Sequence, residues 1–230
     1  MTSTAVVGST GLVGSQILTT LLALPSIVSI HSITRRDPVS TSHKLHPIVS
    51  SDSSSWPGAF SAMTPTPSIF FSALGTTRGA AGGVENQRKI DHDLNLALAQ
   101  AAKAAGVKVY VLISSSGASA ASSMAYPKMK GELEDGVSAL GFDHTIILRP
   151  GLIVGSREES RPAEAVVRKI AGFAGMLGHG FKDFWAQDAE IIAKAAVAGG
   201  LMALEGKVEE KVLILAQSDI VRLGRTEWKA

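Results

Sequence analysis

The sequence contains no cysteine, and this absence excludes disulfide bonds and thiol catalysis anywhere in its 230 residues. Charged residues make up only 18% of the chain, and the formal net charge is +2 without a block of basic residues. Because nucleic-acid-binding domains usually carry a strongly basic face, we expect no nucleic-acid partner. The six histidines are scattered without the spacing of metal ligands, so we expect no metal site.

Long apolar runs are also missing: none approaches the ~20 residues that a membrane-spanning helix needs. A strand is expected to begin by Thr4, which leaves no room for a removable targeting peptide. We therefore expect a mature N-terminus and a soluble, intracellular protein. Hydrophobic residues, in contrast, make up 45% of the chain. This is enough for a well-filled core, and the length fits a single domain over residues 1–230.

The N-terminal segment from Thr4 to Leu22 predicts a strand, a tight turn and a helix. The turn reads Gly8-Ser9-Thr10-Gly11-Leu12-Val13-Gly14. Three glycines here are typical of a dinucleotide-binding turn, where the backbone turns sharply, approaches a pyrophosphate and packs closely against the helix. The free amides and the positive dipole end of the helix then face the phosphates. A turn between strand and helix without a ligand is the alternative interpretation.

A second predicted strand, over residues 27–34, ends in Arg35-Arg36-Asp37. In an NAD-specific site an acidic residue near this place binds the ribose hydroxyls, whereas arginine meets a 2′-phosphate. Arg35 and Arg36 therefore favour NADP(H). Two solvated charges at the end of a strand are the alternative interpretation, and Asp37 leaves some use of NAD open.

Strands and helices alternate along the rest of the chain. Further strands are expected over residues 47–49, 68–74, 108–113, 142–148 and 212–215, and helices over residues 84–105 and 186–204. Ile90, Leu94, Leu98 and Ala101 share one face of the first of these helices. Residues 56–63 are expected to form a surface helix or loop. This alternation predicts an α/β fold, a doubly wound parallel sheet of the Rossmann type covered on both faces.

In a doubly wound sheet, loops at the carboxyl ends of the strands line the ligand crevice. Leu74, Gly75 and Thr76 follow the fourth strand and are therefore expected to border the cofactor. Residues 155–185 depart from the alternation of strands and helices. We expect them to form a small substrate-binding flap within the domain.

Tyr126 and Lys130 are four residues apart and so project from one face of a helix. A nearby ammonium favours the phenolate and lowers the pKa of a tyrosine, which makes the two a proton-transfer pair. A hydroxyl of Ser114, Ser115 or Ser116 would hold the substrate oxygen beside the phenol, and we choose Ser115. The pair alone is also compatible with an amphipathic helix surface, but its place after a strand that ends in serines favours catalysis.

Taken together, these motifs resemble the atypical short-chain dehydrogenase/reductases. Within that group the chain is most similar to the fungal mitochondrial proteome family, which is related to the human HIV Tat-interacting protein. The resemblance covers nearly the whole chain. It rests on the Gly-x-x-Gly-x-x-Gly turn, Leu74-Gly75-Thr76-Thr77-Arg78-Gly79, Ser114-Ser115-Ser116-Gly117, Tyr126 with Lys130-Gly131-Glu132, Leu148-Arg149-Pro150-Gly151 and Glu159-Ser160-Arg161-Pro162.

The resemblance implies an NADP(H)-dependent oxidoreductase for a small carbonyl or alcohol substrate, with Ser115, Tyr126 and Lys130 as catalytic residues. It also implies that Arg35 and Arg36 meet the 2′-phosphate and that Lys130 touches the nicotinamide ribose. The expected cofactor-binding residues are Gly8, Ser9, Thr10, Gly11, Leu12, Val13, Gly14, Arg35, Arg36, Leu74, Gly75, Thr76, Ser114, Tyr126, Lys130, Pro150, Gly151, Leu152, Ile153 and Arg161.

The same resemblance implies a mitochondrial location, peripheral at the outer membrane, and a homodimer. A different class of function is also open, namely an NADP(H)-sensing regulatory or scaffold protein without turnover. The small size of the flap supports that alternative. The pairing of Tyr126 with Lys130 speaks against it, because a sensor needs no proton-transfer pair.

Overall fold

The computed structural model describes residues 1–155 and 186–229. Seven strands in these ranges form one parallel sheet in the order β3-β2-β1-β4-β5-β6-β9. The order reverses direction between β1 and β4, which confirms the predicted doubly wound α/β fold. The strands are β1 (Thr2–Val7), β2 (Ile27–Thr34), β3 (Leu45–Val49), β4 (Ile69–Ser72), β5 (Val109–Ile113), β6 (His144–Leu148) and β9 (Val212–Leu215).

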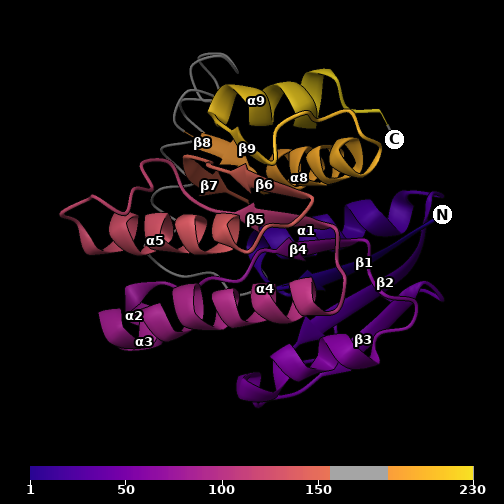
Figure 1. The fold of residues 1–230 in the computed structure, drawn as a ribbon, viewed down its shortest axis with the longest axis horizontal. Helices are drawn as coiled ribbons and strands as arrows, with labels where there is room; N and C mark the ends of the chain where they lie inside the picture. The colour runs from indigo at the N-terminus through magenta and orange to yellow at the C-terminus, as the bar shows by residue number, and fades with distance from the viewer. Residues whose placement is uncertain (156–185, 230) are drawn as a thin grey trace.

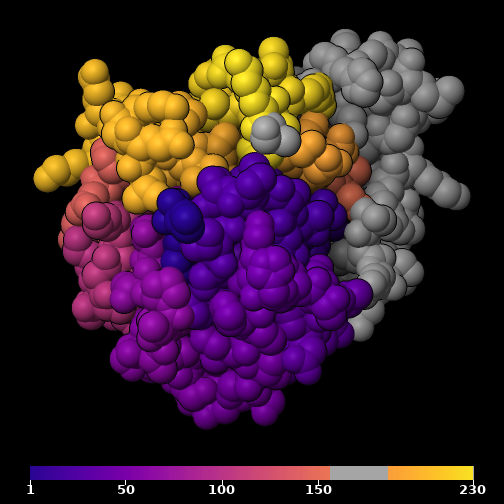
Figure 2. Space-filling view, turned by 90° about the vertical axis from the view of Figure 1, so that its right-hand side faces the viewer, coloured from indigo at the N-terminus to yellow at the C-terminus, as the bar shows by residue number. Residues whose placement is uncertain are grey.

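Helices cover both faces of the sheet (Figure 1). One face carries α1 (Leu12–Ala23) and α8 (Ala189–Leu204), and the other carries α4 (Asn95–Ala104) and α5 (Ala125–Ala139). In Figure 2 the C-terminal region, orange to yellow, packs against the indigo and purple N-terminal half. The shorter elements are η1 (Ser53–Ala62), α2 (Arg78–Ala81), α3 (Val84–Arg88), η2 (Lys89–Leu94), α9 (Gln217–Val221) and η3 (Arg222–Thr226).

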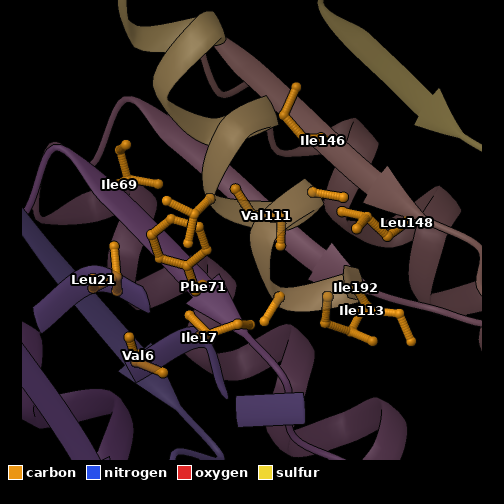
Figure 3. Packing of buried hydrophobic residues seen from close by; sticks show 14 of the residues in the cluster. Val6, Ile17, Leu21, Ile69, Phe71, Val111, Ile113, Ile146, Leu148 and Ile192 are labelled. Atoms are coloured by element: carbon orange, nitrogen blue, oxygen red, sulfur yellow. The ribbon is translucent and has the colours of Figure 1, made fainter. Parts of the chain in front are cut away.

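The core lies on both sides of the central strands. One buried cluster joins α1 and α8 to one face of the sheet, and the members labelled in Figure 3 include Val6, Phe71, Val111, Ile146, Ile17 and Ile192. The adjacent residues of the same strands point to the opposite face. There Val7, Phe70, Tyr110 and Ile147 pack beneath α4 and α5. Burial on both faces explains why the central strands read as continuous apolar runs.

One expected element is anchored more deeply than expected, and another differs. Residues 56–62 lie in the surface helix η1, but Trp56 is only 3% exposed and Phe60 packs edge-on against Phe70, so these two side chains join it to the core. Residues 186–188 were expected to begin a helix. They form strand β8 (Ala186–Asp188), which pairs in parallel with β7 (Leu152–Val154), and the helix begins only after it, at Ala189.

The expected helix over residues 84–105 is divided into α3, the π-helical turn η2 and α4. Its predicted apolar face is also wrong at the N-terminal end. Asp91 and Asn95 are buried there, whereas Ile90 and Leu94 are only half-buried. π-Helical turns often mark functional sites, and this one directs two polar side chains toward the end of β4.

Helix α5 directly supports the loop that precedes it. An added Cβ at Gly131 would lie 2.2 Å from the backbone nitrogen of Ala120, a distance that no side chain can adopt without moving the loop. The loop therefore rests on the helix at Gly131. This contact fixes the segment after β5 relative to the first turn of α5.

We predict that Gly131→Ala lowers the free energy of unfolding by about 1–3 kcal/mol, the usual range for overpacking. Gly136→Ala in the same helix is the matched control, because its Cβ would meet only the flexible side chain of Leu96, at 3.2 Å. The control should be neutral or stabilising by up to ~1 kcal/mol, since alanine favours helix. Urea unfolding of both variants measures the difference. Equal stabilities would contradict the proposed contact.

Candidate active site

The glycine turn is built by two very close backbone approaches. Gly8 has φ +79°, and a Cβ there would lie 2.6 Å from the carbonyl oxygen of Ala73 at the end of β4. A Cβ at Gly14 would lie 2.0 Å from the carbonyl oxygen of Gly8. Only glycine fits either position. The turn is therefore pressed between the end of β4 and the first turn of α1.

The start of α1 has the features of an anion site. Its N-cap residue, Gly11, makes no side-chain cap hydrogen bond, and the first turn contains no acidic residue. The amides of Leu12, Val13 and Gly14 are thus the first-turn donors that an anion would meet. Thr10 is exposed at the same turn. The backbone here fits the pyrophosphate of a dinucleotide.

Ser9 and the arginine pair connect this turn to β2. The Ser9 hydroxyl is buried and lies 2.7 Å from the hydroxyl of Ser32, so its side chain joins the turn to the neighbouring strand. Arg35 and Arg36 follow β2 and are both exposed. Because β2 pairs in parallel with β1, the two arginines lie at the same edge of the sheet as the glycine turn.

The loop after β4 is held by polar side chains from α3, η2 and α4. The carbonyl oxygen of Leu74 accepts a hydrogen bond from Asn95 Nδ2 at 3.2 Å. The Thr76 amide donates to Asp91 Oδ1 at 2.6 Å, and the Thr76 carbonyl accepts from Gln87 Nε2 at 3.0 Å. Leu74 and Thr76 therefore have a fixed backbone at the carboxyl end of β4.

Asp91 is a functional candidate that the sequence analysis missed. Asp91 is only 2% exposed. Burial raises the pKa of its carboxyl group, and the Thr76 amide, Lys130 and Gln87 oppose this effect. Helical periodicity gave no signal for it, because the expected apolar face ran through Ile90. The available sign of a functional role was the position of this aspartate within a helix that was expected to pack on the sheet.

The structure brings Ser115 to Tyr126. Tyr126 is the second residue of α5 and is 42% exposed, and the Ser115 side chain lies near enough to its phenol to lower its pKa. The Ser115 hydroxyl itself donates to the carbonyl oxygen of Ser116 at 3.3 Å. The other two serines differ: Ser114 donates to Glu134 in the interior, and Ser116 is exposed. Of the three serines, Ser115 is the one whose side chain acts on the phenol.

Lys130 lies one turn further along α5 and is 3% exposed. Its Nζ donates to the carbonyl oxygen of Ile113 at 3.1 Å. Burial lowers the pKa of Lys130, while the carboxylates of Asp91 and Glu134 oppose this effect. The side chain is thus anchored at the carboxyl end of β5.

The predicted direction of the Tyr126 shift is wrong in this structure. Burial raises the pKa of Tyr126, the charge of Asp91 raises it further, and the nearby Ser115 side chain lowers it. The reason lies in the surroundings: the ammonium of Lys130 is bound to Ile113, and the charge that acts on the phenol is the carboxylate of Asp91.

The segments that follow β5 and β6 run side by side. The amides of Ser114 and Ser116 donate to the carbonyls of Leu148 and Pro150, at 2.8 and 2.7 Å. The Gly151 amide donates to Gln187 Oε1 at 2.7 Å. Beyond Pro150, the chain enters β7, where Leu152 is 39% exposed and Ile153 packs against the core.

The end of β7 approaches the glycine turn. A Cβ at Gly155 would lie 2.8 Å from Leu12 Cδ1, at the start of α1. The structure thus brings the segment from Pro150 to Ile153 and the glycine turn to one region. The expected flap covers residues 155–185, and all of it after Gly155, together with Arg161, lies outside the described residues.

A cleft of about 380 Å³ opens beside Tyr126. Its lining consists of Thr76, Thr77, Arg78, Val84, Gln87, Ala125, Tyr126 and Met129. The expected cofactor neighbour Thr76 and the expected proton donor therefore share one cleft. In the part of the chain that the structure describes, no three acidic or histidine side chains gather as metal ligands, and no helix has the length and apolarity to cross a membrane.

Comparison with known proteins gives the family. Residues 65–177 match the family model described as HIM1. The chain is 59% identical to "Protein fmp52-1, mitochondrial" of Aspergillus terreus over 98% of this chain and 100% of that protein. It is 50% identical to "Protein fmp-52, mitochondrial" of Neurospora crassa, over 99% and 97% of the two chains.

Two solved structures show the same fold at low sequence identity. MoeE5 in complex with UDP-glucose and NAD has a TM-score of 0.70 at 16% identity, over 98% of this chain and 81% of that chain. A short chain dehydrogenase family protein from Francisella tularensis has a TM-score of 0.67 at 12% identity, over 95% and 98%. With relatives of more than half identity along nearly its whole length, the chain belongs to the Fmp52 family.

Proposed function

We propose that the protein is an NADP(H)-dependent oxidoreductase that interconverts a carbonyl compound and an alcohol. The observation that carries this proposal is the proximity of the Ser115 side chain to the Tyr126 phenol, at the edge of the sheet that also holds the glycine turn. When bound, the nicotinamide would supply or accept the hydride. The fold neighbours MoeE5, solved with NAD, and the enzyme WbmF, solved with NADH, support this class of cofactor.

In the reducing direction, Tyr126 gives its phenolic proton to the substrate oxygen while the substrate carbon gains the hydride. Burial and Asp91 keep the pKa of this phenol above its ordinary value, so the proton is present at neutral pH. The Ser115 hydroxyl positions the substrate oxygen and stabilises the phenolate that remains. Lys130 is held by the carbonyl oxygen of Ile113, and its proposed role is the contact with the nicotinamide ribose that the family resemblance implies.

The phosphate groups of the dinucleotide would be bound at the opposite end of the site. The amides at the start of α1 would hold the pyrophosphate. Arg35 and Arg36, exposed beside that turn, would bind the 2′-phosphate. This charge pair is the basis for preferring NADP(H) over NAD(H).

We also infer a mitochondrial location, because the relatives in Aspergillus terreus and Neurospora crassa carry that word in their names. A peripheral position at the outer membrane and a homodimer are part of the same proposal and come from the family resemblance. Carbonate extraction of purified mitochondria tests the first, and sedimentation of the purified protein tests the second.

Tyr126→Phe should reduce carbonyl reduction by about 10²–10⁴-fold, the usual contribution of a positioned proton donor, without loss of NADPH binding. Ser115→Ala should also reduce turnover, whereas Ser116→Ala is the matched control with an exposed hydroxyl. Turnover of a panel of aldehydes, ketones and quinones, beside NADPH fluorescence titration, measures both quantities. Unchanged turnover by Tyr126→Phe would refute the mechanism. NADPH binding without any turnover by the wild type would favour the sensor alternative.

The double substitution of Arg35 and Arg36 by alanine should weaken NADPH binding by about 10- to 100-fold, because charge-assisted hydrogen bonds to a phosphate are lost. Binding of NADH should stay within threefold of the wild type. Arg222→Ala, which removes an exposed charge at the C-terminal end, is the control. An equal loss of affinity for NADPH and NADH would show that the two arginines do not bind the 2′-phosphate.

Asp91→Asn should shift the pH dependence of carbonyl reduction. The negative charge of Asp91 raises the pKa of Tyr126, so its removal lowers that pKa. As the pH rises, reduction is lost when the phenol ionises, and in the variant this loss should begin at a lower pH. A pH profile of kcat for both proteins measures the direction. A shift to higher pH would contradict the assigned role of Asp91.

A further inference from the structure

We propose that the cleft beside Tyr126 selects substrates with an anionic group, and that Arg78 binds this group. The inference rests on the proposed function and specifies its substrate class: an apolar carbonyl compound that carries a carboxylate or a similar anion. The argument comes from the chemistry of the cleft lining and from the position of Arg78 within it.

The lining contains both polar and apolar residues. Val84, Ala125 and Met129 supply apolar surface, and Tyr126 supplies the proposed proton donor. Arg78 is the cation of this lining, which contains no carboxylate among the residues that the structure describes. A molecule whose oxygen meets Tyr126 and whose body covers the apolar wall would therefore meet a positive charge and no negative one.

Arg78 also lacks a carboxylate partner within the described residues, unlike Arg88, the next arginine along the chain. The guanidinium of Arg88 pairs with Glu132 of α5. Arg78 is exposed and lines the cleft. A guanidinium presents a planar fork that matches a carboxylate in a bidentate arrangement, so this side chain is suited to an anion from solution.

The backbone of Arg78 is fixed. Its carbonyl oxygen accepts hydrogen bonds from the amides of Gly82 and Gly83, and Thr77 caps the start of α2 through its hydroxyl. The preceding residue, Thr76, is anchored to Asp91. The base of the Arg78 side chain is thus held relative to the same buried carboxylate that acts on Tyr126. This connection limits how far the guanidinium can lie from the proton donor, and hence the size of molecule that can bridge them.

The cleft volume of about 380 Å³ lies near the lower end of the range for small-molecule sites. It suits a compound of the size of a substituted benzoate. A matched pair of probes is therefore 4-carboxybenzaldehyde and its methyl ester, methyl 4-formylbenzoate. The two share one aldehyde and one ring, and they differ in the negative charge.

Arg78→Gln should lower kcat/KM for 4-carboxybenzaldehyde by about 10- to 100-fold, the loss of a charge-assisted hydrogen bond. The value for the methyl ester should change by less than about threefold, and so should the dissociation constant of NADPH. Arg88→Gln is the control, since it makes the same change to an exposed arginine outside the cleft lining.

A second measurement is independent of turnover. Isothermal titration with the alcohol 4-(hydroxymethyl)benzoate, with and without NADP⁺, should show binding that Arg78→Gln weakens and Arg88→Gln does not. Three results would overturn the inference. The first is a wild type with the same kcat/KM for the acid and the ester, and the second is no binding of the alcohol. The third is a loss of NADPH affinity in Arg78→Gln as large as its loss of kcat/KM. Binding that depends on Arg78 without reduction of either aldehyde would instead count against the proposed oxidoreductase function.

Discussion

The site depends on one buried carboxylate. A carboxylate that is 2% exposed is costly to bury unless hydrogen bonds and charges compensate it. For Asp91, the Thr76 amide, Gln87 and Lys130 provide this compensation. These three partners come from the loop after β4, from α3 and from α5. Satisfying a single carboxylate therefore fixes the relative position of the segments that form the cleft.

The same carboxylate sets opposite tendencies in the two residues of the proton-transfer pair. It raises the pKa of Tyr126 and so favours the neutral phenol, and it favours the charged form of Lys130 against the effect of burial. A neutral phenol is the form that a proton donor needs. After transfer, the negative charge on the phenolate would face the charge of Asp91, so the return of a proton from solvent is favoured.

The features that the sequence predicted correctly depend on local geometry. Gly8 and Gly14 are needed by the turn itself, the apolar strands follow from burial on both faces, and the spacing of Tyr126 and Lys130 follows from the helix. The features that it did not predict depend on partners far away in the chain. Asp91 points inward because Thr76 offers an amide, and Trp56 is buried in the core on the α4 side of the sheet. Neither contact leaves a periodic signal in its own segment.

The buried charged residues near Tyr126 also bear on the choice between an enzyme and a sensor. Buried ionic groups rarely add stability, and well-packed apolar residues in their place are often neutral or stabilising. Here Lys130, Asp91 and Glu134 are all at most 3% exposed. The charge of Asp91 acts on Tyr126 and on Lys130, and that of Glu134 acts on Lys130. A nucleotide sensor could bind its ligand with the glycine turn and the arginine pair alone. The charged interior beneath Tyr126 has a physical use in moving a proton, and this favours turnover over sensing alone.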